Sequence, residues 1–226
     1  MSALDPRIAQ GTARMLAARD RALARGAGAL GWKAGFGAPA ALASWGTDRP
    51  LVGFLTRDRQ VASGALVEVS RWAKPVLEAE VAAHLAADLG PGASPEEALA
   101  SVGGWSVAIE LADVSFPPHD LGQVLADNIF HRHVLLGPVL PERPSPLSFS
   151  VRRDGEEVSA TADPEALTGE LGAVLASMAG TLGACGAALV AGDVVITGSV
   201  VAPLPAAAGR WVADAGALGA VQVTLR

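Results

Sequence analysis

The sequence has a single cysteine, Cys185, and no tyrosine among its 226 residues. A lone cysteine excludes an internal disulfide framework and a zinc site built on thiolates, and it is typical of a reducing cytoplasm. No apolar run reaches the roughly 20 residues that span a bilayer, and the N-terminus lacks the apolar core of a signal peptide. We therefore expect a cytoplasmic protein with no membrane partner.

Basic charge is also scarce. Lys and Arg number 17 against 23 Asp and Glu, which gives a net charge of −6. Without a cluster of basic residues, this balance argues against a nucleic-acid partner. Apolar residues make up 50% of the chain and charged residues 18%, which excludes wholesale disorder. The length favours one domain over residues 1–226, whose first 28 residues form an N-terminal helical segment.

The hydrophobic pattern predicts an α+β protein. Helices are predicted over residues 5–25, 39–45, 95–101, 121–126 and 164–182. Strands are predicted over residues 29–36, 51–55, 61–62, 66–69, 105–114, 133–136, 194–197, 210–213 and 221–225, with a hairpin of 147–153 and 157–160 around Asp154-Gly155. Few helices scattered among many short strands indicate a mostly β core.

Residues 75–85, PVLEAEVAAHL, are ambiguous, and the chemistry depends on them. In a strand, Glu78 and Glu80 share one face with Cα atoms about 6.5–7 Å apart, and a neighbouring strand about 4.8 Å away brings Glu110 beside them. Three carboxylates in apolar segments suit Mg²⁺ or Mn²⁺. In a helix, Glu78 and Glu80 lie about 200° apart and share no site. Glutamates on a solvated face remain the ordinary explanation, so spacing alone leaves both open.

Three further segments carry candidate groups. Lys33 in GWKAG is either a snorkelling surface residue or a partly buried amine suited to proton transfer. Asp48 in WGTDRP is by default a turn residue. The end of GDVVITGS, at Thr197 and Gly198, either binds a carboxylate or forms a simple turn.

The histidines give weaker signals. In a strand, His84 shares a face with Glu78, but six residues span about 20 Å, so the two cannot bind one ion. His131 and His133 share a strand face with no third ligand nearby in the sequence. We expect packed or exposed histidines rather than a second metal site.

Taken together, the segments GWKAGFG, WGTDRPLVGFL, KPVLEAEVAAHL, AIELADVSF, LADNIFHRHVLLGP and GDVVITGS resemble the 2-keto-4-pentenoate hydratase group. That group belongs to the fumarylacetoacetate hydrolase superfamily and includes 2-oxo-hept-3-ene-dioate hydratases and 4-oxalocrotonate decarboxylases. The resemblance runs from about residue 5 to the C-terminus. It implies a mixed β-sandwich roll with peripheral helices, and therefore a strand over residues 75–85.

The resemblance also implies a site. A divalent metal, usually Mg²⁺ or Mn²⁺, is held by carboxylates that match Glu78, Glu80 and Glu110. A catalytic lysine matches Lys33, and its acidic partner matches Asp48. Enzymes of the group act on small 2-oxo or 2-hydroxy-dienoic acids from aromatic-compound degradation, and often oligomerise. The resemblance therefore implies a homo-oligomer, or a complex with a related decarboxylase or hydratase.

One segment departs from the family pattern. A D-N-A-S stretch of the family appears here as Asp127-Asn128-Ile129-Phe130, followed by His131 and Arg132. If this stretch lines the pocket, its substrate contacts have changed. Candidate substrate-binding residues are Thr197, Gly198, Asp127, Phe130 and Arg132. Arg132 either pairs with a second substrate carboxylate or lies in solvent.

Three functions follow from the resemblance. The first is a hydratase that converts a 2-hydroxy-dienoate such as 2-hydroxypenta-2,4-dienoate into a 4-hydroxy-2-oxo acid. The second is a decarboxylase of the 4-oxalocrotonate type, which needs a cation such as Arg132 for the far carboxylate of its substrate. The third is a non-catalytic partner subunit of such an enzyme.

Overall fold

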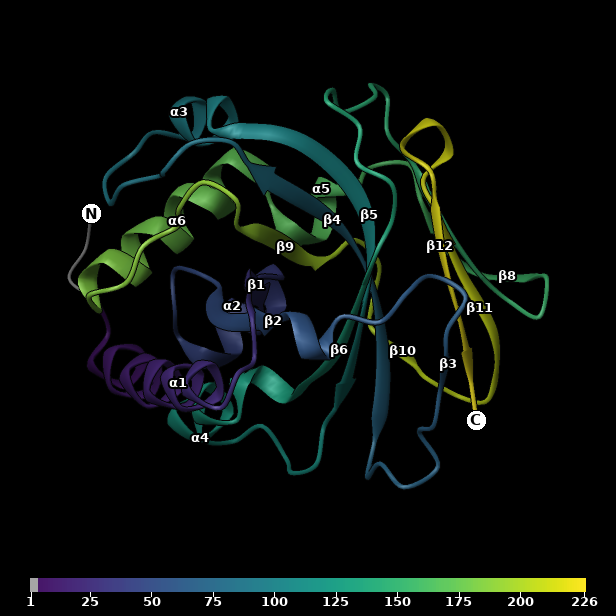
Figure 1. The fold of residues 1–226 in the computed structure, drawn as a ribbon, viewed down its shortest axis with the longest axis horizontal. Coiled ribbons are helices and arrows are strands. Elements are labelled where there is room, and N and C mark those ends of the chain that lie inside the picture. Colours follow the sequence, from purple (N-terminus) through teal and green to yellow (C-terminus); the bar gives the residue numbers. More distant parts are fainter. Residues whose placement is uncertain (1–3) are drawn as a thin grey trace.

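A computed structural model describes residues 4–226, whose strands form two sheets (Figure 1). The larger sheet has the order β2-β1-β9-β4-β5-β6, with β10 paired to β4, and the smaller has the order β3-β12-β11-β7-β8. These two sheets, together with the helices around them, confirm the α+β class and the mixed-sheet architecture. The larger sheet contains β1 (Ala29–Gly35), β2 (Leu51–Thr56), β4 (Pro75–Leu85), β5 (Val102–Asp113), β6 (His131–Leu136), β9 (Val194–Ser199) and β10 (Leu204–Pro205).

The remaining elements pack around this sheet. The smaller sheet contains β3 (Leu66–Val67), β7 (Phe149–Arg153), β8 (Glu156–Thr161), β11 (Gly209–Asp214) and β12 (Ala220–Leu225). The helices are α1 (Pro6–Ala24), α2 (Pro39–Trp45), α3 (Pro95–Ala100), α4 (Leu121–Ala126), α5 (Glu165–Thr168) and α6 (Leu171–Ala184), with short 3₁₀ turns η1 (Arg57–Arg59), η2 (Asn128–Phe130) and η3 (Gly216–Leu218). Within residues 4–226, no helix is long and apolar enough to cross a membrane.

Strand β5 separates the main core from the side that carries the site. Its side chains alternate between two faces, and Val107, Ile109 and Leu111 enter a core shared with Trp211 and Val223 of the smaller sheet. The intervening residues face the other way: Ala108 packs with Val134 and Ile196, Ala112 packs with residues of α1 and α4, and Glu110 lies between them on this face. The same alternation on β4 sends Glu78 and Glu80 to that side.

Two predicted elements differ from the structure. The helix predicted over residues 164–182 is two helices, because Gly169 adopts a left-handed φ of 82° and ends α5 before α6 begins. Residues 61–62 form no strand, although the Val61 N–H donates to the Val134 carbonyl at 2.9 Å. The predicted hairpin is confirmed, with Asp154 and Gly155 at φ values of 52° and 90° in its turn.

Candidate metal and catalytic site

Three glutamates converge where β4 and β5 pair. The antiparallel register sets Glu78 directly opposite Glu110, and Glu80 follows on the same face of β4. One carboxylate oxygen from each of the three lies within 4.8 Å of the other two. Like charges directly opposite each other destabilise a strand pair, so this register requires a compensating cation or proton.

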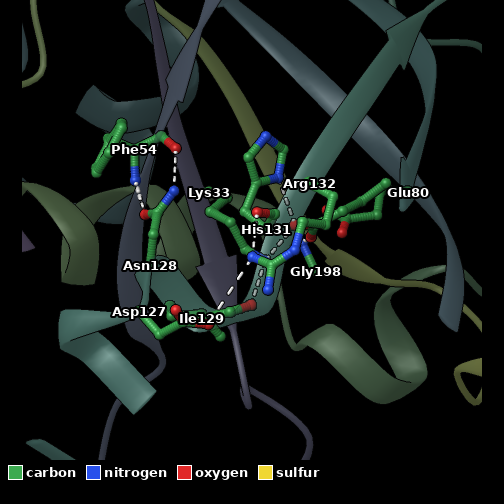
Figure 2. Close-up of polar contacts among 10 residues, drawn as sticks. Lys33, Phe54, Glu80, Asp127, Asn128, Ile129, His131, Arg132 and Gly198 are labelled. Atoms are coloured by element: carbon green, nitrogen blue, oxygen red, sulfur yellow. Dashed lines mark hydrogen bonds and ion pairs between the residues drawn. The ribbon is translucent and has the colours of Figure 1, made fainter. Parts of the chain in front are cut away.

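Two of the buried carboxylate oxygens in this cluster lack a hydrogen-bond partner among the described residues. Glu80 and Glu110 are fully buried, whereas Glu78 is half-buried. The Gly198 N–H donates to Glu80 Oε2 at 2.6 Å (Figure 2). Glu80 Oε1 and Glu110 Oε2 have no hydrogen-bond partner in the described part of the chain. Orphaned buried oxygens are costly, and a hard divalent ion such as Mg²⁺ or Mn²⁺ prefers carboxylate oxygens, so the three residues fit such an ion.

The pKa values of the three carboxyls diverge. Burial, followed by the charge of Glu110, raises the pKa of Glu78 to about 7. Burial and the same neighbouring charges raise the pKa of Glu80 well above its usual value. Burial also acts to raise the pKa of Glu110, but the charge of Lys33 and the hydrogen bond from His131 outweigh it and lower that pKa. Lys33 and His131 therefore favour the charged form of Glu110, whereas protons compete with a metal ion at Glu78 and Glu80.

Lys33 lies beside this cluster. It sits on β1, between β2 and β9, and is 1% exposed. Its Nζ ion-pairs with Glu110 Oε1 and donates to the Ile129 carbonyl at 3.3 Å. A buried ammonium needs such partners, so the buried interpretation of Lys33 is confirmed, and its acidic partner is Glu110.

Asp48 does not lie beside Lys33, contrary to the expectation from the resemblance. Its side chain precedes β2, is 63% exposed, and forms an ion pair with Arg49, whose Nε lies 2.7 Å from Asp48 Oδ1. The physical reason is the turn in WGTDRP, which directs Asp48 outward while the adjacent Arg49 neutralises it. Among the residues that the structure describes, Asp48 is not part of the cavity wall around Lys33.

The segment that departs from the family pattern is wound left-handedly. Asn128, Ile129 and Phe130 have φ values of 55°, 52° and 63°, a conformation that costs non-glycine residues of the order of 1–3 kcal/mol each. Asn128 supports the turn: its Oδ1 accepts the Phe54 N–H at 2.7 Å and its Nδ2 donates to the Phe54 carbonyl at 2.9 Å (Figure 2). The turn thereby aims the Ile129 carbonyl at Lys33.

The sequence predicted neither this role of Asn128 nor the contact between His131 and Glu110. Asparagine is the residue that both tolerates left-handed φ and pairs with backbone groups, which is the signal that was present. The contact of His131 Nδ1 with Glu110 Oε1, at 2.7 Å, comes from the pairing of β5 with β6. The two residues are far apart in the sequence, so inspection of neighbouring residues alone could not reveal it.

A cavity of about 580 Å³ opens over the glutamates. Its walls are mainly apolar, with Phe36, Val76 and Phe130 among them, and its charged lining residues in the described chain are Lys33, Lys74 and Glu78. Glu80 and Glu110 lie buried behind this surface. A small acid with an apolar body suits such walls.

The predicted substrate-binding residues divide between two cavities. Phe130, Thr197 and Gly198 line the first cavity, although the Thr197 hydroxyl donates to the Val81 carbonyl at 3.0 Å and is thereby engaged by the backbone. Asp127 and Arg132 line a second cavity of about 490 Å³ instead. These two residues do not line the first cavity, and their role in substrate binding stays a prediction.

The position of Arg132 has a physical cause. Its guanidinium lies 3.8 Å from Asp127 and 3.9 Å from Asp113, and it donates to the His131 carbonyl at 3.1 Å. Two carboxylates and a carbonyl thus hold it over the second cavity. The interpretation of Arg132 as the partner of a second substrate carboxylate in the first cavity finds no support.

Comparison with known proteins agrees with this architecture. Residues 33–225 match the family described as fumarylacetoacetate (FAA) hydrolase C-terminal. The chain belongs to this family.

Relatives with two different activities are similar to this chain in sequence. The 4-oxalocrotonate decarboxylase of Pseudomonas sp. (strain CF600) is 29% identical over 198 residues, which cover 84% of this chain and 75% of that protein. The 2-keto-4-pentenoate hydratase 1 of Dechloromonas aromatica (strain RCB) is 30% identical over 185 residues, which cover 79% of this chain and 70% of that protein. The structure of 4-oxalocrotonate decarboxylase from Pseudomonas putida G7, complexed with magnesium and adipate, superposes with a TM-score of 0.86 at 26% identity, covering 94% of this chain and 83% of that one.

Proposed function

We propose that this protein is a divalent-metal-dependent lyase that hydrates a 2-hydroxy-dienoate such as 2-hydroxypenta-2,4-dienoate to a 4-hydroxy-2-oxo acid. The observation that carries the proposal is the convergence of Glu78, Glu80 and Glu110 beneath a mainly apolar cavity that Lys33 also lines. These glutamates would hold Mg²⁺ or Mn²⁺. Such an ion supplies Lewis-acid stabilisation of the negative charge that develops on a 2-oxo group. Magnesium in the related decarboxylase structure supports the choice of ion.

The residues of the chain supply proton transfer and orientation. Glu110 and the Ile129 carbonyl hold the Lys33 ammonium at the cavity wall. From there, Lys33 moves a proton from the 2-hydroxyl oxygen to the terminal carbon of the dienoate, which gives a 2-oxo-3-enoate. Water then adds its oxygen to C4 and a proton to C3. The apolar walls hold the hydrocarbon part of the substrate in one orientation.

A second candidate, decarboxylation of a 2-oxo-3-enedioate, is favoured by the position of Lys74. Lys74 directly precedes β4, and Lys74, Val76 and Glu78 all line the cavity. The Lys74 ammonium and the Glu78 carboxylate therefore lie on the wall of one cavity. Lys74, rather than Arg132, is the cation available for the far carboxylate, which leaves as CO₂ in this reaction.

Turnover with and without metal tests both candidates. We expect the ultraviolet absorbance of 2-hydroxypenta-2,4-dienoate to fall when the protein and Mn²⁺ are added, and EDTA to stop the reaction. A 2-oxo-3-enedioate substrate, assayed for CO₂ release, tests the decarboxylase. Full activity in EDTA or in Glu80→Gln would refute the metal role. A protein that binds Mn²⁺ but turns over neither substrate would instead be a non-catalytic partner subunit.

A further inference from the structure

His131 lines the second cavity and contacts Glu110, whereas Lys33 and Glu78 line the first cavity. We propose that His131 is a positioning residue that fixes Glu110 in its metal-binding orientation, and that it keeps Glu110 there when Lys33 moves toward substrate. This inference rests on the proposed function, since it assumes that Glu110 is a metal ligand. It concerns a side chain that the resemblance did not assign to any role.

The two carboxylate oxygens of Glu110 differ in their hydrogen-bond partners. Oε1 accepts both from Lys33 and from His131 Nδ1, the latter at 2.7 Å. Oε2 has no partner within residues 4–226 and belongs to the cluster of three glutamates. Because both donors bind one oxygen, the carboxylate plane is fixed and the other oxygen is left for the ion.

His131 is itself held rigidly. Its side chain is 3% exposed, it begins β6 in register with Ala112 of β5, and it directly follows the left-handed turn that Asn128 supports. Figure 2 shows its ring approaching the cluster with one nitrogen and directing the other away. That second nitrogen, Nε2, has no hydrogen-bond partner in the described chain, and His131 lines the second cavity. Within residues 4–226, Glu110 is therefore the one side chain to which the ring hydrogen-bonds.

The need for this second donor follows from the task of Lys33. To exchange a proton with substrate, the Lys33 ammonium must weaken its bond to Glu110 Oε1. Without His131 that buried oxygen would lose its only remaining donor, and the carboxylate could rotate away from the ion. A hydrogen-bond partner behind a metal ligand typically contributes 10–100-fold to metal affinity.

Metal titration of the apo protein tests the inference without reference to turnover. The protein is dialysed against EDTA and then against buffer, and Mn²⁺ is titrated calorimetrically into the unmodified chain, His131→Leu, His131→Asn and His84→Asn. We expect His131→Leu to weaken Mn²⁺ binding about 10-fold or more. His131→Asn places an amide N–H close to the position of Nδ1, so it should restore affinity to within about 3-fold of the unmodified protein.

His84→Asn is the matched control. His84 is a half-buried histidine on the same sheet, on the strand that carries Glu78 and Glu80. Its Nε2 contacts the Ser106 hydroxyl at 2.8 Å, and within residues 4–226 it has no carboxylate partner. We expect its Mn²⁺ affinity to be unchanged. Circular dichroism verifies that each variant is folded.

The outcomes separate this inference from the proposed function. Mn²⁺ binding by folded His131→Leu at the unmodified affinity would overturn the positioning role and leave the metal site intact. Equal weakening in His131→Leu and His131→Asn would also overturn it, because the amide donor would then have no effect. Failure of the unmodified protein to bind Mn²⁺ would overturn the proposed function and this inference together.

Discussion

Replacing Glu80 by glutamine should stabilise the metal-free protein and at the same time abolish its metal binding. The three carboxylate oxygens lie within 4.8 Å of one another. At an effective dielectric constant of about 20, two unit charges at that separation repel by about 3–4 kcal/mol. The substitution removes the repulsion of Glu80 with Glu78 and with Glu110, while the amide keeps an oxygen for the Gly198 N–H.

The size of this stabilisation depends on pH. Burial and neighbouring charges raise the pKa values of Glu78 and Glu80 above 4.5 in the folded protein. The folded chain therefore holds these protons more tightly than the unfolded chain. The resulting stability is fully present below about pH 4.5 and is lost as the pH rises through the raised pKa values. Glu80→Gln removes one of the two titrating groups, so its advantage grows with pH.

The expected magnitude is smaller than the full repulsion because Glu78, whose pKa burial and the charge of Glu110 raise to about 7, relieves part of the repulsion when it is protonated. We expect the free energy of unfolding of Glu80→Gln to exceed that of the unmodified protein by about 2 kcal/mol at pH 8. For a chain of this size, that difference raises Tm by about 4–8 °C. At pH 5 the difference should fall to roughly a quarter of that value.

Differential scanning calorimetry in EDTA at the two pH values measures this effect. Glu142→Gln, which changes an exposed loop carboxylate, is the control and should leave Tm unchanged. Adding Mn²⁺ should raise the Tm of the unmodified protein and of the control, because ligand binding stabilises the folded state, but it should leave Glu80→Gln unaffected. A lower Tm for Glu80→Gln than for the unmodified protein in EDTA at pH 8 would refute the reasoning.

Four further outcomes are expected. Lys33→Met should reduce kcat about 10²–10⁴-fold while Mn²⁺ still binds in a calorimetric titration; unaltered kcat would exclude Lys33 from proton transfer. Lys74→Met should raise KM for a 2-oxo-3-enedioate about 10-fold and leave KM for 2-hydroxypenta-2,4-dienoate unchanged, as steady-state assays would show. Asn128→Ala should lower the free energy of unfolding in urea by about 2–3 kcal/mol, because the Phe54 N–H and carbonyl lose their partner and alanine disfavours left-handed φ. Mn²⁺ affinity should increase between pH 6 and pH 8 as Glu78, with a pKa of about 7, loses its proton; a flat calorimetric profile would contradict this.

The metal cluster was predictable because strand periodicity and strand spacing are local rules. Alternation along β4 places Glu78 and Glu80 on one face, and the sheet spacing brings β5 within reach. The spacing could not choose between strand and helix for this segment, and the family resemblance made that choice. The observed register then paired Glu78 with Glu110 directly.

Other parts of the site depend on contacts between distant segments, and these the sequence did not reveal. Asp48 matched a family motif, yet its side chain is 63% exposed and forms an ion pair with the neighbouring Arg49. Arg132 was considered for the substrate cavity, but Asp113 and Asp127 hold it over the second one. Each of these positions is set by which charge lies nearest in three dimensions, and that follows from packing rather than from residue spacing.

The left-handed turn escaped prediction for a different reason. Ile129 and Phe130 disfavour positive φ intrinsically, so local propensity argues against the observed backbone. Tertiary contacts override it: the Asn128 side chain binds both backbone groups of Phe54, and the Phe130 ring packs against Phe116 with centroids 4.8 Å apart. Strain of this kind is characteristic of functional sites.

The most direct test of the metal site is the anomalous diffraction of crystals soaked in Mn²⁺. We predict one strong manganese peak between the carboxylates of Glu78, Glu80 and Glu110, with metal–oxygen distances of about 2–2.3 Å. Crystals that show no peak there under saturating Mn²⁺, or that show the three carboxylates turned away from one another, would contradict the central claim that these residues bind a divalent ion.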